Sequence, residues 1–401
     1  MFKSLKRITY QALDLDKARE WYSALLHREP VFDTPFAVIF TVGGCSLSVI
    51  KGIPPLPEDT RRIITYWEVE DVDSAYQTLL EAGALPVSEV KTVFSIKVAQ
   101  VADPFGNVIG ITGDAVRPEE QTVDRRPSEA ARTVAYCRAL AALDDREEIR
   151  GPDSLASIFL SDDDRRTLKD HASREWVITR LITPRLFGYF MARTAYIDEV
   201  FKKALRSNIP QIVMLGAGYD TRPYRFQDMI RDTRIFEMDI RPTQQRKRDK
   251  LIQKGIAIPE QLSYVTIDFT TETIEDTLIP AGFESSEKTL FIWEGVMYYL
   301  SAEAVNSVLG FVAAHSPEGS TICFDHMSQA VESVHSGEPF RFWVGNDDLE
   351  AFLSPRGFKM LEHLTPDRIR KRYLTLCDGS TAFDTLPFFS FALASVKSGD
   401  S

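Results

Sequence analysis

Three carboxylates in the second half of this 401-residue chain each close a short apolar run. Asp239 closes RIFEMD, Asp268 closes YVTID and Glu294 closes TLFIWE. Such strand-like runs predict neighbouring strands of a parallel sheet, which would bring the three acids to one edge. One acid after a strand is usually a helix cap or a solvated turn. Three acids at one edge predict a ligand with ribose hydroxyls and positive charge.

A glycine step precedes these acids. Residues 211–222 read QIVMLGAGYDTR, an apolar run followed by Gly216 and Gly218. Glycine lets the backbone turn sharply and approach a ligand, although a plain tight turn explains one GxG step equally well. Thr221 stands where a dinucleotide site requires a third glycine or alanine. S-adenosylmethionine has no pyrophosphate to cradle and carries a sulfonium that carboxylates stabilise, so it is favoured over a nicotinamide dinucleotide.

The elements that position these residues carry further motifs in a fixed order. They are ARTAYID at 192–198, LGAGYDTRPYRF at 215–226, FEMDIRPTQQRKRDKL at 236–251, IDF at 267–269, FIWEGVMYYL at 291–300, GEPF at 337–340 and RGF at 356–358. From about residue 130 to 401 the chain resembles the leucine carboxyl methyltransferase family, in its bacterial small-molecule O-methyltransferase branch. The resemblance implies an α/β fold, a Rossmann-like class I methyltransferase domain that uses S-adenosylmethionine.

The resemblance also implies roles for single residues. Arg193 would pair with the carboxylate of the methionine moiety, because a guanidinium can make bidentate hydrogen bonds; the alternative is an ordinary surface arginine. Asp239 would accept from the ribose hydroxyls, and Glu294 would lie beside the methionine amino group and sulfonium. The implied cofactor-binding residues are Arg138, Arg193, Gly216, Ala217, Gly218, Asp239, Asp268, Phe269 and Glu294.

The residues that would bind the methyl acceptor are less clearly indicated by the sequence. Methyl transfer is an in-line displacement for which placement alone can supply about 7–11 kcal/mol, and only a hydroxyl acceptor would profit from a base. Tyr299 is the candidate at the pocket floor, and His326 is the nearest candidate base unless it is a capping or structural histidine. Phe340, Arg341 and Trp343 are candidates for acceptor binding; a core or lid segment, or an exposed arginine, explains them equally well.

The first half contains an internal repeat of a βαβββ unit at about 60 residues. Helical patterns at 14–26 and 71–84 each follow one strand pattern and precede three. With DPFGN at 103–107, residues 1–114 resemble the vicinal oxygen chelate superfamily of glyoxalase and bleomycin-resistance proteins. The resemblance implies an α+β domain in front of the methyltransferase domain.

Metal chemistry is not expected in this front domain. Where metal-binding members of the superfamily carry histidine and glutamate, this chain has Arg7, Ser48, Ile64 and Gly110. A divalent site needs three or four nitrogen or oxygen donors, so we predict no metal and no glyoxalase or dioxygenase activity. The domain could bind an apolar acceptor, form a homodimer surface or only support the methyltransferase.

Composition bounds the remaining possibilities. A polar, proline-bearing stretch at 115–129 predicts a linker between domains at 1–114 and 130–401. The net charge of −11 disfavours nucleic acid, and we interpret KRDK at 247–250 as a solvated helix surface. Four scattered cysteines indicate neither zinc nor disulfides. With no signal region and no apolar run long enough to span a membrane, we expect a soluble cytoplasmic protein.

The predicted function is an S-adenosylmethionine-dependent O-methyltransferase that methylates a carboxylate or hydroxyl of a small molecule, in secondary metabolism. One alternative is methyl esterification of a protein C-terminal carboxylate. Another is non-catalytic binding of a small molecule by the front domain, as in resistance proteins. The sequence leaves the identity of the acceptor open.

Overall fold

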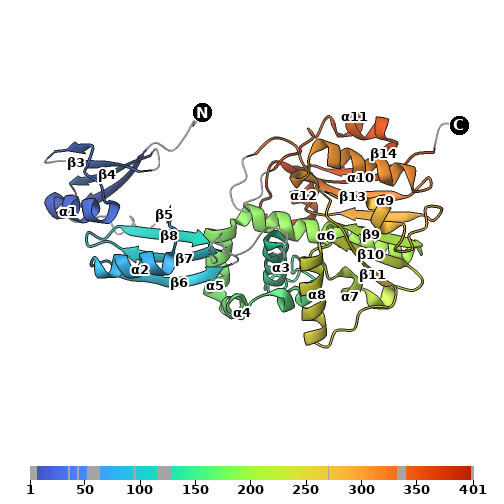
Figure 1. Ribbon diagram of the computed structural model, residues 1–401, viewed down its shortest axis with the longest axis horizontal. Coiled ribbons are helices and arrows are strands. Elements are labelled where there is room, and N and C mark those ends of the chain that lie inside the picture. The colour runs from blue at the N-terminus through green and yellow to red at the C-terminus, as the bar shows by residue number, and fades with distance from the viewer. Residues whose placement is uncertain are drawn as a thin grey trace. The chain divides into compact units, whose positions relative to one another are not determined.

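The protein divides into two compact units, Met1–Glu120 and Gln121–Ser401, in a computed structural model (Figure 1). The structure describes residues 7–34, 37–42, 45–51, 64–93, 96–114, 128–269, 271–331 and 340–398. Most of the predicted linker at 115–129 lies outside these described residues.

The first unit consists of two similar halves, each with a four-stranded sheet. The first half contains β1 (Arg7–Ala12), α1 (Leu15–Leu26), β2 (Phe32–Asp33), β3 (Ala37–Val42) and β4 (Cys45–Lys51). The second contains β5 (Thr65–Glu68), α2 (Val72–Glu81), β6 (Leu85–Val93), β7 (Ile96–Ala102) and β8 (Val108–Asp114). The strand orders, β1-β4-β3-β2 and β5-β8-β7-β6, are equivalent, and each first strand pairs in parallel with the last. The predicted duplicated βαβββ unit is confirmed.

Polar contacts join the two halves of this unit. Tyr22 of α1 donates to Asp103 Oδ2 at 2.6 Å, and Asn107 Nδ2 donates to the Gln11 carbonyl at 2.9 Å. Asp103 and Asn107 belong to the DPFGN turn, so that motif connects the second half to the first. Around them, buried apolar side chains from both halves form one core.

The second unit contains a seven-stranded sheet in the order β11-β10-β9-β12-β13-β15-β14. Its strands are β9 (Gln211–Leu215), β10 (Arg234–Asp239), β11 (Leu262–Thr266), β12 (Thr289–Trp293), β13 (Thr321–Met327), β14 (Phe358–Leu364) and β15 (Phe389–Val396). β9 to β13 run parallel, and β15 is antiparallel to both neighbours. All residues of β9 and β12 are buried, which explains why their sequences are apolar without alternation.

The order of the central strands creates a switch point. From β9 the chain builds outward through β10 and β11, then returns to place β12 on the other side of β9. Ligands of open α/β sheets bind beyond the carboxyl ends of the strands at such a switch point. The loops after β9 and β12 are therefore the expected place for a cofactor.

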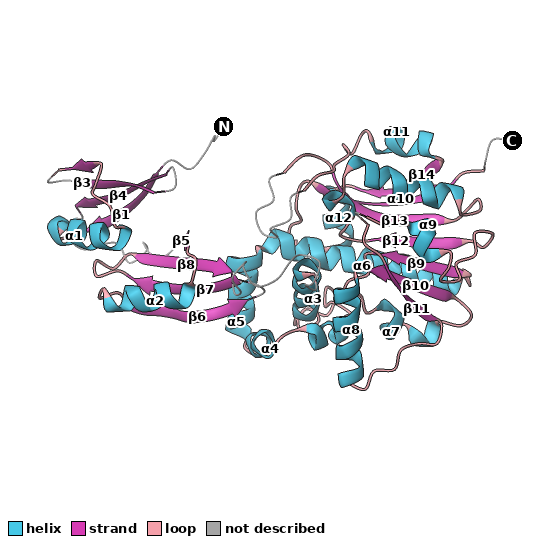
Figure 2. Cartoon of the chain, in the orientation of Figure 1, coloured by secondary structure: helices cyan, strands magenta, loops and turns pink. Residues whose placement is uncertain are grey.

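Helices surround the strands of this unit, drawn in cyan and magenta in Figure 2. The α-helices are α3 (Glu129–Ala141), α4 (Asp162–Lys169), α5 (His171–Trp176), α6 (Pro184–Arg206), α7 (Arg222–Arg225), α8 (Arg241–Gln253), α9 (Ile274–Leu278), α10 (Ala302–Ala314), α11 (Leu349–Leu353) and α12 (Pro366–Tyr373). Short helical turns are η4 (Ser154–Phe159), η5 (Val177–Ile182), η6 (Gln227–Met229), η7 (Met297–Tyr299) and η8 (Ser354–Arg356). None of the helices in the described ranges combines the length and the apolar character that a membrane crossing requires.

Two sequence interpretations need correction. The run predicted as a strand at 264–268 is shifted, because β11 ends at Thr266 and Asp268 lies two residues beyond it. The KRDK run is not a solvated surface throughout, since Lys247 is fully buried and its Nζ lies 2.6 Å from Glu237 Oε2.

Candidate active site

The loop after β9 contains two glycines with positive φ, Gly216 at +71° and Gly218 at +50°. The amides of Gly216 and Ala217 both donate to the Met238 carbonyl at 2.9 Å. A Cβ on Gly216 would collide with Val296 Cγ2, and one on Gly218 would lie 3.1 Å from the Cβ of Ala131 on α3. The glycines are thus required by close contacts within the protein, whatever a ligand adds.

Substituting Gly216 by alanine should destabilise the second unit. A side chain at positive φ costs about 1–2 kcal/mol, and the collision with Val296 adds to this. In a Val296→Ala background the colliding Cγ2 is absent and only the cost of the positive φ remains. The loss of unfolding free energy should therefore be smaller there. Urea denaturation of the two single variants and the double variant measures this; equal losses in both backgrounds would contradict the packing argument.

Asp239, the last residue of β10, lies beside this loop. Its Oδ2 accepts from the Gly218 amide at 2.6 Å and its Oδ1 from the Ile240 amide at 2.8 Å. Burial raises the pKa of Asp239, while these backbone hydrogen bonds oppose that rise. The structure therefore brings the predicted ribose-binding acid to the glycine loop.

Asp268 and Phe269 lie beyond the neighbouring strand, β11. Both are half-buried, and Phe269 packs against the core of the second unit. The Asp268 amide donates to Glu272 Oε2 at 2.8 Å. Because β11 pairs in parallel with β10, these two residues lie at the same sheet edge as Asp239.

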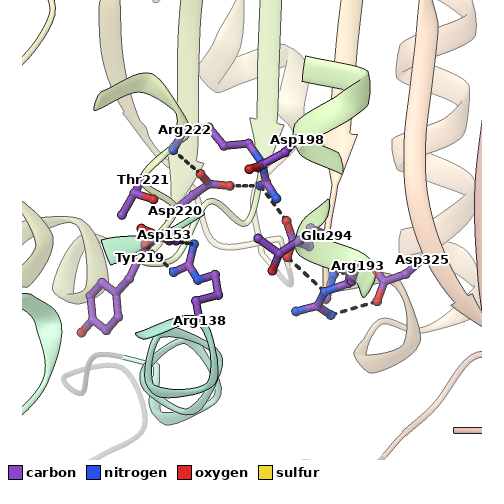
Figure 3. Close-up of polar contacts among 12 residues, drawn as sticks. Arg138, Asp153, Arg193, Asp198, Tyr219, Asp220, Thr221, Arg222, Glu294 and Asp325 are labelled. Atoms are coloured by element: carbon purple, nitrogen blue, oxygen red, sulfur yellow. Dashed lines mark hydrogen bonds and ion pairs between the residues drawn. The ribbon is translucent and has the colours of Figure 1, made fainter. Parts of the chain in front are cut away.

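Next to the glycine loop lies a set of paired charges that we call the arginine–carboxylate network (Figure 3). Its members are Arg138, Arg193, Arg222, Arg225, Asp153, Asp198, Asp220, Glu294 and Asp325. With four guanidinium groups and five carboxylates, the network carries one formal negative charge in excess.

Arg193 of α6 occupies one end of the network and is only 2% exposed, so it is not a surface arginine. Its Nε forms an ion pair with Glu294 Oε1 at 3.0 Å, without the alignment of a hydrogen bond. Its Nη1 donates to Asp325 Oδ2 at 3.0 Å and to the Tyr189 hydroxyl at 3.1 Å. The guanidinium is held in one orientation by these contacts.

Glu294 lies between Arg193 and Arg222, as Figure 3 shows. Arg222 Nη1 donates to Glu294 Oε2 at 2.7 Å and also to Asp220, and its Nε donates to Asp198 Oδ1 at 2.8 Å. Burial alone would raise the pKa of Glu294, but the two guanidinium groups outweigh it and lower that pKa. Glu294 is therefore an ionised carboxylate already paired within the protein, and it does not face a sulfonium as an unpaired acid.

Arg138 of α3 contacts the glycine loop from the other side. Its Nη2 donates to the Tyr219 carbonyl at 2.6 Å, and its Nη1 lies 3.2 Å from Asp153 Oδ2. Arg138 also lines a cavity of about 320 Å³. Side chains from α3, α6 and α12 form much of its wall, among them Cys137, Phe190, Met191, Arg372 and Tyr373.

The candidate acceptor residues fall into two groups. Tyr299 and Phe340 are half-buried, with ring centroids 5.4 Å apart, and each packs against Tyr298. Tyr298 in turn brings its hydroxyl to 3.5 Å from Arg193 Nη1, which connects this aromatic group to the network. The side chains of Arg341 and Trp343 are exposed, Trp343 at 48%.

His326 does not join the network. It follows Asp325 on β13, and successive residues of a strand point to opposite faces of a sheet. It is 1% exposed, with its Nε2 3.3 Å from His363 Nε2, and burial together with His363 lowers the pKa of His326 to about 4. The role of His326 as a base stays a prediction. Its burial on the face opposite Asp325 does not favour that role.

Comparison with known proteins identifies the family of the second unit. The leucine carboxyl methyltransferase family matches residues 131–313. YktD of Bacillus subtilis (strain 168), a proposed S-adenosyl-L-methionine-dependent methyltransferase, is 31% identical over 214 residues, which are 49% of this chain and 70% of YktD. The chain belongs to the leucine carboxyl methyltransferase family. The matched range contains every predicted cofactor-binding residue.

One further relative and one solved structure illustrate the extent of the similarity. A proposed S-adenosyl-L-methionine-dependent methyltransferase of Frankia alni is 32% identical over 193 residues, 47% of this chain and 64% of the relative. Among solved structures, a proposed methyltransferase from Thermobifida fusca YX has a TM-score of 0.44 at 13% identity, over 71% of this chain and 100% of that chain. The glyoxalase/bleomycin resistance protein/dioxygenase superfamily matches residues 4–111, within the first unit.

Several network residues of this leucine carboxyl methyltransferase family member were missed by sequence reasoning. Asp198 lies in ARTAYID, and Asp220 and Arg222 lie in GAGYDTR, so the signal was present in motifs already quoted. Asp325 near the end of β13 carries the same signal as Asp239, an acid closing an apolar strand. Tyr189, which donates to Asp325, has no such signal because it is one of many aromatic residues of α6.

In the first unit, one of the four positions that carry metal ligands in other members of the superfamily has no room for a side chain. A Cβ on Gly110 would lie 2.6 Å from Cδ1 of Tyr66, so the tyrosine ring fills that position. Ser48 is 2% exposed, Ile64 is half-buried, and the side chain of Arg7 lies outside the described residues. Within the described ranges, no three or more His, Cys, Asp or Glu side chains gather as metal ligands.

Proposed function

We propose that this protein is an S-adenosylmethionine-dependent O-methyltransferase that acts on a carboxylate or hydroxyl of a small molecule. The observation that carries the proposal is the position of Asp239, whose carboxylate contacts the Gly218 amide at the carboxyl edge of the sheet. This is where a nucleoside ribose is expected in a sheet of this topology. Membership of the leucine carboxyl methyltransferase family supports the same cofactor.

The charges of the site fit this cofactor. Its carboxylate, ammonium and sulfonium together carry one positive charge, which complements the one excess carboxylate of the arginine–carboxylate network. Arg138 Nε and Arg222 Nη2 are buried donors to which the described residues offer no hydrogen-bond acceptor. Asp239 would hold the ribose, and Arg193 and Arg138 the methionine carboxylate.

When bound, S-adenosylmethionine supplies an electrophilic methyl group. The contribution of the protein is then placement, which can lower the barrier by about 7–11 kcal/mol. Tyr298, Tyr299 and Phe340 present an aromatic surface next to Arg193, which would exclude water and hold the body of an acceptor. A carboxylate acceptor needs no base, and for a hydroxyl acceptor Tyr299 is the candidate to hold that hydroxyl by a hydrogen bond at the pocket floor.

Three parts of the proposal rest on the resemblance to the bacterial branch of the family. They are oxygen as the methyl acceptor, a small molecule as the substrate and a place in secondary metabolism. The cavity beside Arg138 shares only that side chain with the residues proposed to bind cofactor and acceptor, so it does not support this assignment. Labelled methyl donor, incubated with the protein and an extract of its source cells, should yield a small molecule enlarged by one CH₂ in mass spectrometry.

Binding of S-adenosylhomocysteine, measured by calorimetry, tests the cofactor directly. The wild-type protein should bind it, and Asp239→Ala should weaken binding about 10- to 150-fold, because a charge-assisted hydrogen bond contributes about 1.5–3 kcal/mol. Asp249→Ala, an exposed acid on the neighbouring α8, is the control and should bind like the wild type. Wild-type protein that does not bind the nucleoside would refute the proposal.

A further inference from the structure

A fully buried ion pair lies below the glycine loop. Lys247 of α8 is 0% exposed and Glu237 of β10 is 1% exposed, and the ammonium donates to Glu237 Oε2 at 2.6 Å. The other oxygen, Glu237 Oε1, is buried and has no hydrogen-bond partner among the described residues. Removing two charges from water is costly, so a buried pair of this kind is weak evidence for a purely stabilising role.

The position of Glu237 suggests another role. Glu237 and Asp239 are two residues apart on β10, so their side chains share one face of the sheet. The intervening Met238 points to the opposite face, into the apolar core. The charge at Glu237 is therefore next to the carboxylate that is proposed to bind the ribose.

Several titratable groups face this pair from the elements around it. They are Asp239 on β10, Asp220 in the glycine loop, Tyr224 on α7 and Tyr264 on β11. The ring of Tyr224 lies 5.7 Å from the ammonium, and its hydroxyl is hydrogen-bonded to that of Tyr264. Lys247 interacts electrostatically with three carboxylates, those of Glu237, Asp239 and Asp220.

We propose that Lys247 is a positioning residue for cofactor binding: its ammonium keeps Asp239 ionised beside a second buried carboxylate, Glu237. This inference rests on the proposed function, because it assigns to Asp239 the role of ribose acceptor. The ionised form of Asp239 accepts hydrogen bonds from two hydroxyl groups, whereas a protonated carboxyl must donate one. Without Lys247, uptake of a proton would disturb that geometry.

The direction of the pKa shifts agrees with this arrangement. Burial raises the pKa of Glu237 to about 7 even though Lys247 opposes the rise. Burial also raises the pKa of Asp239, and Lys247 again lowers it. Removing the ammonium must therefore raise the pKa of both carboxyl groups further. Since binding is lost as the pH falls through the pKa of Asp239, the loss should then begin at a higher pH.

Three variants test the proposal: Lys247→Met, Glu237→Gln, and the double variant, in which both charges are removed at nearly constant volume. Affinity for S-adenosylhomocysteine is measured by calorimetry from pH 6 to pH 9, and folding is followed by circular dichroism. Lys247→Met should weaken binding at pH 6, by at most about tenfold for each unit by which the pKa of Asp239 rises, and binding should recover toward pH 9. The double variant should bind within about threefold of the wild type, because the cation and the anion are lost together.

Glu237→Gln, which leaves Lys247 facing Asp239 and Asp220 without Glu237, should show the weakest pH dependence of all. If Lys247→Met does not fold, the comparison of Glu237→Gln with the double variant still shows whether Lys247 affects binding, because these two proteins differ only at residue 247. Equal pH profiles of these two, or a folded Lys247→Met protein that binds like the wild type at every pH, would overturn the inference alone. Absence of binding by the wild type would instead overturn the proposed function, and this inference with it.

Discussion

Arg222→Met is expected to lower the unfolding free energy by about 3–5 kcal/mol near pH 8, the usual effect of removing one partner from buried ion pairs. Arg222 is fully buried and contacts Asp198, Asp220 and Glu294, so its loss leaves three carboxylates without their shared cation. Methionine fills much of the same volume, which confines the change to charge and hydrogen bonding.

The effect should depend on pH in a defined direction. In the wild type the pKa values of Asp220 and Glu294 are lowered, because Arg222 and other cations outweigh the effect of burial. These groups therefore stabilise the native state above their unfolded pKa, and that stabilisation is lost as the pH falls through the folded value. In the variant, burial without the cation raises both pKa values, so protonation relieves the destabilisation and the difference from wild type should shrink from pH 8 to pH 5.

Urea denaturation at several pH values measures this difference. Arg231→Met, an exposed arginine before β10, is the matched control and should change the unfolding free energy by no more than about 0.5 kcal/mol. A difference between variant and wild type that grows toward pH 5 would contradict the assignment of Arg222 as the cation of this cluster.

Arg193→Met should impair both stability and cofactor binding. It removes the cation between Glu294 and Asp325, and Asp325 is 0% exposed, so a loss of about 3–5 kcal/mol in unfolding free energy is expected. Binding of S-adenosylhomocysteine should weaken about 10- to 150-fold in addition, through loss of a charge-assisted contact of about 1.5–3 kcal/mol to the methionine carboxylate.

Two further substitutions separate these effects. Arg193→Lys keeps the charge but not the planar fork, so it should recover part of the stability and little of the affinity. Arg206→Met changes an exposed arginine of the same helix and should leave both quantities near the wild-type values. Calorimetry below the unfolding temperature of each variant keeps the binding measurement independent of unfolding. Wild-type affinity in folded Arg193→Met would remove Arg193 from the proposed site.

The sequence predicted the elements that carry the site because their signals are local. The runs ending in Asp239 and Glu294 are rich in large apolar residues, and every residue of β12 is buried. The repeated strand–helix–three-strand pattern of the first unit is likewise visible at short range, and its helices begin at Asp14 and Asp71, whose side chains accept from backbone amides. Acids at the ends of parallel strands then share one edge by geometry alone.

What the sequence did not predict depends on contacts between distant segments. The partners of Arg193 come from β13 and the loop after β12, more than 100 residues away, and no local pattern records them. Helix α8 buries Thr243, Gln244 and Lys247 together with Leu251, so its inner face is largely polar and hydrophobic periodicity does not identify it. The sequence likewise contained no sign that His326, the candidate base, lies on the opposite face of β13 from Asp325.

The beginning of the second unit has a practical consequence. Ser128 caps α3 by accepting from the Ala131 amide at 3.1 Å, and its own amide donates to Thr243 Oγ1 on α8 at 3.0 Å. Three residues later the Cβ of Ala131 lies close to Gly218. Arg138 Nη2 donates to the carbonyl of Tyr219. Residues 128–138 of the second unit thus form a wall beside the glycine loop. An excised catalytic fragment that starts after α3 would lack this wall, and the shortest functional version has to begin upstream of Ser128.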